Sequence, residues 1–184
     1  MEITRKINPH IFRGYDIRGI YNEDLFESTA YTIGKAYGTY LKTKFNGNKV
    51  IIGEDNRVSS PALARALIEG VLSTGVDVMY LGVVTSPMLY YANEIYDIRA
   101  GIMVTASHNP KEDNGLKFAF KDYLNAKGEE ITDFYEETIK GDFLDGVGSV
   151  RKINVKEEYF KAIKDGLEFG NKRIKAVLDP GNGT

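Results

Sequence analysis

Hydrophobic positions follow two different periods along the chain, and their alternation predicts an α/β fold. Four stretches carry apolar side chains with the period of an amphipathic helix: residues 24–42, 62–73, 88–96 and 129–140. Three shorter runs, rich in β-branched residues, are typical of buried strands: residues 50–53, 76–81 and 100–104. Strands that alternate with helices in this way favour a mainly parallel sheet with right-handed crossovers and helices on its faces.

A further strand is expected over residues 116–121, where three apolar side chains alternate with polar or small ones. This alternation places Lys117 on the face opposite to the apolar side chains. The dipeptide Asn114-Gly115 directly before it is a strong signal for a tight turn. We therefore expect this strand to run antiparallel to the strand 100–104, which makes the sheet mixed.

The glycine-rich stretch 141–149 is expected to join two parts of the chain. After it, the pattern predicts a helix over 155–169 and a strand over 172–179. We therefore expect an N-terminal domain of residues 1–145, followed over 146–184 by a linker and the start of a second α/β domain. On this interpretation the chain is the N-terminal portion of something longer. The alternative, in which the last strand pairs with the first sheet, stays open.

Charge and composition narrow the chemistry. With 24 basic and 26 acidic residues the net charge is −2, so the overall charge does not attract the chain to nucleic acid or to a membrane. The chain has no cysteine, which excludes disulfides and thiolate zinc sites and fits a cytoplasmic protein. The first residues lack the apolar core of a signal peptide, and no stretch has the length of a membrane span. Because there are only 2 histidines, a bound metal is expected to be a hard cation held by oxygens.

A polar loop, Thr105-Ala106-Ser107-His108-Asn109-Pro110, follows the strand 100–104. Its proline fixes its own φ and moves the preceding residue away from helical geometry, so the loop presents Ser107 and His108 in a defined way. Ligands of parallel sheets bind beyond the carboxyl ends of the strands, and this loop lies at that edge. Ser107 is therefore a candidate nucleophile or phosphate carrier. The alternative, on this loop alone, is a serine that only hydrogen-bonds to its own backbone.

A second candidate loop, residues 11–19, carries Arg13 and Arg18, each followed directly by a glycine. A guanidinium group binds phosphate or carboxylate through two parallel hydrogen bonds, which lysine does less selectively. The alternative is a surface segment in which one arginine is paired with Asp16. The acidic residues of the helix 129–140 are interpreted as a solvated face and not as a metal site.

Taken together, three loops resemble the α-D-phosphohexomutase family, in its phosphomannomutase/phosphoglucomutase branch. They are residues 12–19 (Phe-Arg-Gly-Tyr-Asp-Ile-Arg-Gly), residues 53–59 (Gly-Glu-Asp-Asn-Arg-Val-Ser), and residues 105–110 with 114–118 (Asn-Gly-Leu-Lys-Phe). The first of these loops favours the hexose enzymes over the phosphoglucosamine mutase branch. The resemblance covers the whole chain, and residues 179–184 look like the opening of the family's second domain.

The resemblance implies a phosphoserine enzyme with four domains around one cleft, of which this chain holds domain 1. Phosphorylated Ser107 would transfer its phosphoryl group to a hexose 1- or 6-phosphate, and the bisphosphate would turn over and return its other phosphate. The implied cofactors are Mg²⁺ and hexose 1,6-bisphosphate, the latter as activator and intermediate. The implied partners are a phosphosugar substrate and the remaining domains of the parent chain, with no nucleic acid and no membrane.

The resemblance also assigns catalytic roles at four positions. Ser107 carries the phosphoryl group, and Arg18, Lys117 and His108 compensate its charge. Either Lys117 or His108 exchanges the proton of the sugar hydroxyl.

Other residues are expected to assist. Tyr15 and Arg13 are expected to bind the substrate, while Asn109 and Arg57 hold the loop by hydrogen bonds. Ser107 is the implied metal ligand, through its phosphate, and the other ligands lie outside this chain because the family's aspartate-rich metal loop has no counterpart here. The chain alone is therefore expected to be inactive.

Two alternatives belong to other classes of protein. The first is a non-catalytic phosphate-binding or interaction domain that keeps the loop without turnover. The second is a serine hydrolase using Ser107 and His108. It is disfavoured because neighbouring loop residues rarely reach hydrogen-bond register, no nucleophile-elbow glycines flank the serine, and His10 is the only other histidine. The choice between mannose and glucose would rest on the absent loops, and the phosphorylation state of Ser107 stays open.

Overall fold

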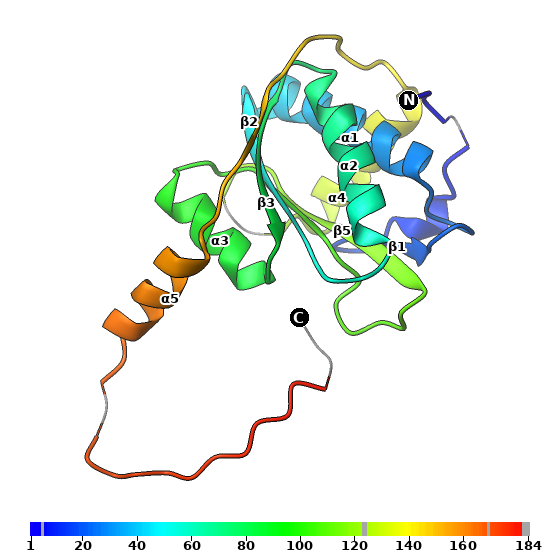
Figure 1. The fold of residues 1–184 in the computed structure, drawn as a ribbon. Coiled ribbons are helices and arrows are strands. Elements are labelled where there is room, and N and C mark those ends of the chain that lie inside the picture. The colour runs from blue at the N-terminus through cyan, green and yellow to red at the C-terminus, as the bar shows by residue number, and fades with distance from the viewer. Residues whose placement is uncertain (5, 123–124, 169, 182–184) are drawn as a thin grey trace.

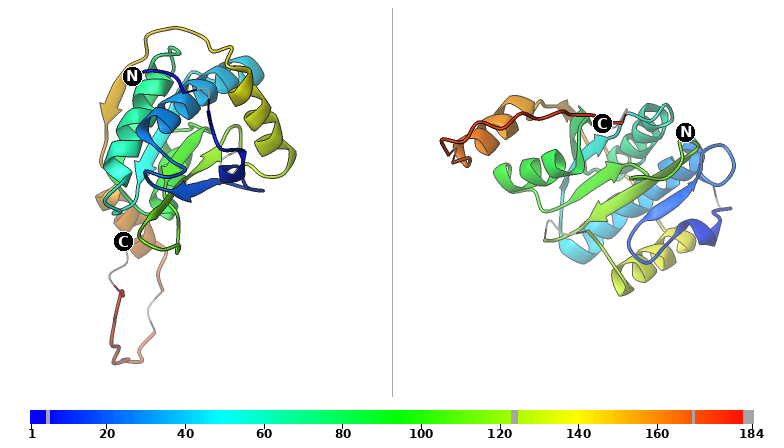
Figure 2. Two further views of the ribbon diagram at one scale, coloured as in Figure 1. Left: turned by 90° about the vertical axis from the view of Figure 1, so that its right-hand side faces the viewer. Right: turned by 90° about the horizontal axis from the view of Figure 1, so that it is seen from below.

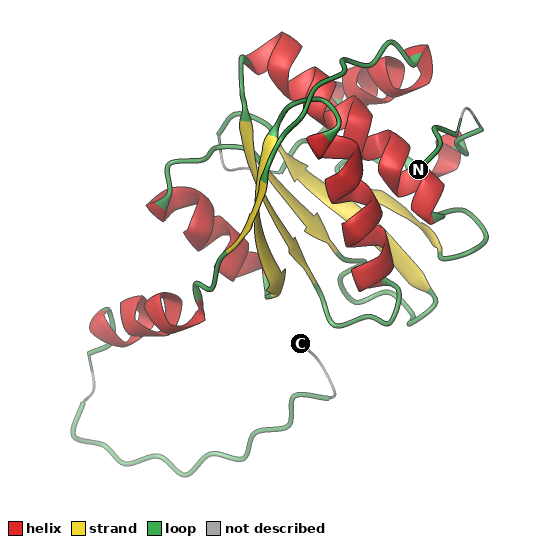
Figure 3. Ribbon diagram, turned by 45° about the horizontal axis from the view of Figure 1, so that its top comes forward, coloured by secondary structure: helices red, strands yellow, loops and turns green. Residues whose placement is uncertain are grey.

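A six-stranded sheet lies between two layers of helices (Figures 1 and 3). The computed structural model describes residues 1–184 apart from 5, 123–124, 169 and 182–184. In spatial order the strands are β1 (Ile17–Ile20), β5 (Asp113–Ala119), β4 (Gly101–Val104), β2 (Lys49–Glu54), β3 (Asp77–Val83) and β6 (Val150–Lys152). Neighbouring strands from β4 to β6 pair in parallel, whereas β5 is antiparallel to both β4 and β1. The predicted mixed, mainly parallel sheet is confirmed.

The helices divide unequally between the two faces of the sheet. Their bounds are η1 (Pro9–Ile11, 3-10), α1 (Glu27–Phe45), α2 (Ser60–Leu72), α3 (Ser86–Ile95), α4 (Glu129–Lys140) and α5 (Lys156–Asp165). One core contains buried residues of α1, α2 and α4 against the side chains of Val50 and Ile52. A smaller core packs α3 against the opposite side chains of Ile51 and Met103. The strand β1 lies at one end of the sheet and β6 at the other (Figure 2). None of the described helices has the length and apolar character needed to cross a membrane.

Tyr37 of α1 fixes the end of β5 from inside the larger core. Its ring is fully buried and stacks on Phe118 and Phe120 with centroid distances of 5.8 and 5.1 Å. Its hydroxyl donates to the carbonyl oxygen of Ala119 at 2.6 Å, and burial raises the pKa of this phenol far above its ordinary value. The hydroxyl therefore stays protonated and keeps its hydrogen bond, which holds the strand that carries Lys117.

Helices α1 and α2 approach so closely that glycine is required at their crossing. A Cβ atom added to Gly70 would lie 2.1 Å from the carbonyl oxygen of Tyr31, and one added to Gly34 would lie 2.3 Å from that of Leu67. Both neighbours are helical backbone, which cannot rotate away. The two glycines thus set the spacing of the helices behind β2.

We expect Gly70→Ala to destabilise the protein by up to about 2 kcal/mol. Alanine gains about 1 kcal/mol over glycine in a helix interior, but overpacking against rigid backbone costs about 1–3 kcal/mol, so the clash wins. Thermal denaturation would measure the effect. Gly166→Ala is the matched control, because a Cβ there would make only ordinary contacts at 3.6 Å or more. A Gly70→Ala protein at least as stable as the parent would contradict the prediction.

Two local predictions are wrong. Asn114-Gly115 does not form the turn but lies inside β5, where Asn114 pairs with Gly19 and Gly115 with Arg18. The reason is tertiary: a Cβ on Gly115 would lie 2.2 Å from the carbonyl oxygen of Ile17, so the glycine allows close strand contact. The buried Asn114 amide donates to the hydroxyls of Ser59 and Ser60 at 2.8 and 2.9 Å.

The second wrong prediction is the strand over residues 172–179, which is exposed and has no β pairing among the described residues. A strand is stabilised by its neighbour, and this segment lies apart from the sheet (Figure 1). Instead β6, which the pattern does not predict, extends the sheet beside β3. The helix predicted over 155–169 is observed as the shorter α5, which ends at Asp165. Residues 169 and 182–184 lie outside the described part of the chain. The division at residue 145 stays a prediction.

Candidate active site

The Ser107 loop leaves the carboxyl end of β4 with a strained backbone. Ser107 is exposed and has φ of 58°, in the left-handed region that a residue with a Cβ seldom adopts. The hydroxyl of Thr105 supports this conformation by accepting a hydrogen bond from the Ser107 amide at 2.9 Å. Strain of this kind costs on the order of 1–3 kcal/mol and persists only where the surroundings enforce it. Here the surroundings are two arginines.

Arg57 holds the Ser107 loop by donating hydrogen bonds to the carbonyl oxygens of three loop residues and of Asp113, the first residue of β5. Its Nη1 donates to Pro110 at 2.5 Å and to Asp113 at 2.9 Å, and its Nη2 donates to Ser107 at 3.1 Å and to Asn109 at 2.8 Å. One planar guanidinium thus bonds to Ser107 and to three residues that follow it, a geometry that the single ammonium of lysine cannot reproduce.

Asp55 orients Arg57. Its carboxylate lies 3.1 Å from the Nε of Arg57 and also accepts a hydrogen bond from the Arg57 amide at 3.1 Å. The Ser60 hydroxyl, at the start of α2, donates to the same carboxylate at 2.5 Å. The end of β2 and the start of α2 therefore fix the arginine, which in turn fixes the loop after β4.

Arg18 supports the loop from the other side. Its Nη1 donates to the carbonyl of Ala106 at 3.2 Å and to Oδ1 of Asn109 at 2.6 Å, while its Nε pairs with Asp16 at 2.7 Å. The side-chain amide of Asn109 in turn donates a hydrogen bond to the Asp113 carboxylate at 2.7 Å. Of the two alternatives for this arginine, the pairing with Asp16 is observed, although Arg18 is buried and does not lie on the surface. Binding of a phosphate by Arg18 stays a prediction.

Lys117 lies beside Tyr15 on the same face of the sheet. Its Nζ is 5.6 Å from the centroid of the Tyr15 ring and 3.9 Å from the carboxylate of Asp16. As predicted from the alternation, Leu116 and Phe118 lie in the core and Lys117 does not. The Tyr15 side chain is 55% exposed, so its ring can meet a ligand from solution.

His108 and Arg13 complete the set of predicted residues. The His108 Nδ1 is 3.3 Å from the Ser107 hydroxyl, and both side chains are exposed. Arg13 lines a hollow of about 300 Å³ together with Arg18 and Asp113. Four of the eight predicted positions lie on the loops after β4 and β2, three lie before or at the start of β1, and Lys117 lies inside β5.

Three contributors were not predicted, Asp55, Thr105 and Asp113, whereas Asp16 was considered only as the ion-pair partner of an arginine. Each acts on another side chain or on the backbone, so none has a signature of its own in the sequence. The spacing of Asp55 two residues before Arg57, and of Asp113 four residues after Asn109, is the signal that could have indicated them.

The carboxylates near the loop do not form a metal cage. Among the described residues there is no group of three or more histidines, cysteines, aspartates or glutamates that could hold a metal ion. Asp16, Asp55 and Asp113 are each engaged, with Arg18, Arg57 and Asn109.

Glu54, the last residue of β2, is a buried carboxyl of a different kind. It is 3% exposed, and its Oε2 has no hydrogen-bond partner in the described structure. Burial raises its pKa above the ordinary value, and nearby Asp55 adds to this, although a hydrogen bond from Tyr80 and the charge of Lys152 oppose it. The folded state therefore binds this proton more tightly than the unfolded state does.

We expect Glu54→Gln to raise the melting temperature at about pH 7 but not at about pH 4. Because the folded pKa is raised, the wild-type protein loses stability as pH rises from the ordinary pKa of a glutamate through the folded value, and glutamine removes this loss. Thermal melts of both proteins at the two pH values measure it, with the exposed Glu94→Gln as control. An equal difference at both pH values would refute the prediction.

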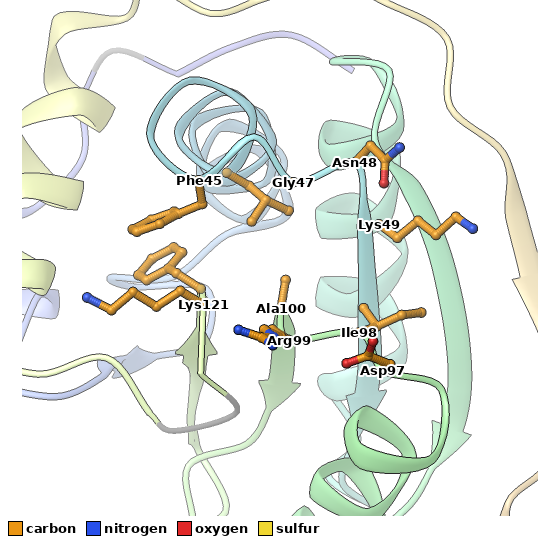
Figure 4. Close-up of a pocket in the computed structure, with 11 residues that line it drawn as sticks. Phe45, Gly47, Asn48, Lys49, Asp97, Ile98, Arg99, Ala100 and Lys121 are labelled. Atoms are coloured by element: carbon orange, nitrogen blue, oxygen red, sulfur yellow. The ribbon is translucent and has the colours of Figure 1, made fainter.

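A larger cavity lies at the opposite edge of the sheet (Figure 4). It has a volume of about 350 Å³ and is lined by Phe45, Arg99, Phe120 and Lys121 among others. These residues come from the amino end of β4, the end of α1 and the segment after β5. The cavity therefore shares no wall with the Ser107 loop, and size alone does not identify the site.

The fold and this site define an α/β/α domain with an exposed serine on a loop at the carboxyl edge of its sheet, where two arginines hold the loop backbone. Residues 9–145 match the family model of phosphoglucomutase/phosphomannomutase, alpha/beta/alpha domain I. The chain therefore belongs to the phosphoglucomutase/phosphomannomutase family.

Individual relatives agree with this assignment. A Pseudomonas aeruginosa protein named phosphomannomutase/phosphoglucomutase is 40% identical over 94% of this chain and 37% of its own length. A Pyrococcus abyssi protein named probable phosphoglucosamine mutase is 39% identical over 91% of this chain and 37% of its own length. The crystal structure of a phosphoglucomutase/phosphomannomutase family protein from Burkholderia thailandensis superposes with a TM-score of 0.82 and 31% identity, over 89% of this chain and 37% of that one. The chain thus spans about 37% of the length of these relatives.

Proposed function

We propose that this chain is the phosphoserine-bearing N-terminal portion of a phosphohexomutase, which interconverts the 1- and 6-phosphates of mannose or glucose through a 1,6-bisphosphate. The observation that carries the proposal is the Ser107 loop. Its serine is exposed and held at positive φ, and Arg57 and Arg18 fix the backbone on either side of it. A side chain that must give up and regain a phosphoryl group needs this fixed, accessible position, because phosphoryl transfer depends on alignment and charge compensation.

In the proposed reaction, a hydroxyl oxygen of the hexose phosphate attacks the phosphorus on Ser107. The bond between phosphorus and the serine Oγ breaks as the new bond to the sugar oxygen forms, which gives the bisphosphate and free serine. The sugar hydroxyl loses its proton to Lys117 or His108, and the serine oxygen gains one. After the sugar turns over, its other phosphate reacts with Ser107 by the reverse step. Tyr15 and Arg13 contact the sugar phosphate.

Mg²⁺ is part of the proposal, with hexose 1,6-bisphosphate as activator. When bound, the cation would compensate negative charge on the transferred group. The phosphate of Ser107 would provide its ligand within this chain, and the others would come from further residues of the protein. On this proposal the chain alone is inactive, because it holds neither the remaining ligands nor the loops that select the sugar.

The test is an assay of the natural-length protein, of which this chain is proposed to be the N-terminal portion, with Mg²⁺ and glucose 1,6-bisphosphate. We expect it to interconvert hexose 1- and 6-phosphates of glucose, of mannose, or of both. The substrate panel includes glucosamine 1-phosphate, since the Pyrococcus abyssi relative bears the name of a phosphoglucosamine mutase. Turnover of the amino sugar alone would move the assignment to that branch. Phosphate binding without turnover of any sugar would favour a non-catalytic phosphate-binding domain.

A further inference from the structure

The carboxylate of Asp16 lies between the two cationic side chains that the proposed function needs. Asp16 precedes β1 and its side chain is 1% exposed. Its Oδ2 is 2.7 Å from the Nε of Arg18 and 3.9 Å from the Nζ of Lys117. Arg18 and Lys117 project from the same face of the sheet, since Arg18 pairs with Gly115 and side chains alternate along β5.

The two cations extend from Asp16 in different directions. Arg18 uses its Nη1 to bond to Ala106 and Asn109, the residues on either side of the exposed pair Ser107-His108. Lys117 instead lies over the ring of Tyr15. A single carboxylate therefore touches one side chain that holds the serine loop and another that faces the entrance beside Tyr15.

The contacts of Asp16 are incomplete in a way that stability does not explain. Its Oδ1 is buried and has no hydrogen-bond partner in the described part of the chain. Burying a carboxylate with one oxygen unpaired is costly, and apolar residues of similar volume often replace a buried ion pair without loss of stability. What apolar residues cannot supply is a fixed direction for a guanidinium group and an ammonium group.

We infer that Asp16 is a positioning residue of the active site, which holds Arg18 against the Ser107 loop and Lys117 beside Tyr15. This role rests on the proposed function, because it concerns the side chains that would compensate and move charge during phosphoryl transfer. Asp16 touches neither the serine nor, being buried, a substrate. It acts only through the two cations.

The first test measures the loop and does not depend on turnover. Amide hydrogen exchange of residues 105–109 is compared in the natural-length protein and its Asp16→Asn, Arg18→Met and double variants. We expect Asp16→Asn to speed exchange of the Asn109 amide about tenfold in the parent and to have little further effect when Arg18 is already replaced. The control is Asp77→Asn, because Asp77 accepts hydrogen bonds from the amide and the hydroxyl of Ser149 at the start of β3, away from the loop. Unchanged exchange in Asp16→Asn would overturn the inference.

The second test separates positioning from loss of folded protein. We expect Asp16→Asn to lower kcat on the order of 10²-fold without raising KM, because removal of a negative charge does not weaken the attraction for phosphate. In a Lys117→Met background the same change should lower kcat much less. Equal factors in both backgrounds would indicate a general structural defect and overturn the inference. If the parent has no mutase activity, the proposed function fails, and the exchange experiment still decides the role of Asp16.

Discussion

Ser107→Ala is expected to abolish turnover in the natural-length protein, with kcat falling on the order of 10⁴-fold or more. Alanine has no oxygen to carry the phosphoryl group, so the covalent half of the proposed cycle cannot occur. The flanking geometry should survive, because the Ser107 carbonyl and amide, and not its hydroxyl, bond to Arg57 and Thr105. The measurements are the rate of glucose 1-phosphate conversion and the intact mass after incubation with glucose 1,6-bisphosphate and Mg²⁺. The parent should gain one phosphoryl group and the variant none.

Ser73→Ala is the control for this experiment. Ser73 follows α2 at the opposite edge of the sheet, where its hydroxyl donates to the carbonyl of Gly70 at 2.7 Å. That variant should keep both the rate and the added mass. A Ser107→Ala protein that works at close to the parental rate would refute the phosphoserine mechanism and favour a domain that binds phosphate without transferring it.

The layered fold was predictable because its signals are periodic and local. The helix over residues 129–140 has the bounds of α4, and three predicted buried runs correspond to β2, β3 and β4. Strand β6 escaped prediction because it is short, exposed and includes two basic residues, so its place beside β3 depends on pairing and not on its own composition. The segment 172–179 shows the converse, since β-branched residues without a neighbouring strand form no sheet.

That Ser107, Arg57 and Arg18 lie close together was predictable, but the hydrogen bonds between their segments were not. Order along the chain and the carboxyl ends of the strands were enough to bring Ser107, Arg57 and Arg18 to one edge. Which arginine holds which carbonyl depends on side-chain directions that no spacing encodes. Asn114-Gly115 is the clearest case, because its turn propensity yields to a close contact between β1 and β5 and to hydrogen bonds with two serines.

Arg57→Met is expected to lower the free energy of unfolding by about 3–5 kcal/mol, because it leaves a buried charge unpaired. The side chains of Arg57 and Asp55 are only 12% and 8% exposed, so solvent cannot replace the lost partner. The variant also removes four hydrogen bonds to loop carbonyls, and mutase activity should fall more than stability alone explains. Chemical denaturation measures the first effect, and kcat under folded conditions the second.

Arg57→Lys distinguishes the charge of Arg57 from its shape. Lysine keeps a positive charge opposite Asp55, so it should recover part of the stability, but one ammonium group cannot bond to carbonyls of Ser107, Asn109 and Pro110 at once. We therefore expect stability and activity to separate in this variant, with activity staying low. The control is Arg99→Met, since Arg99 is exposed at the opposite edge of the sheet. Full activity in Arg57→Lys would mean that charge alone holds the loop, and the four directed hydrogen bonds would then have no role in presenting Ser107.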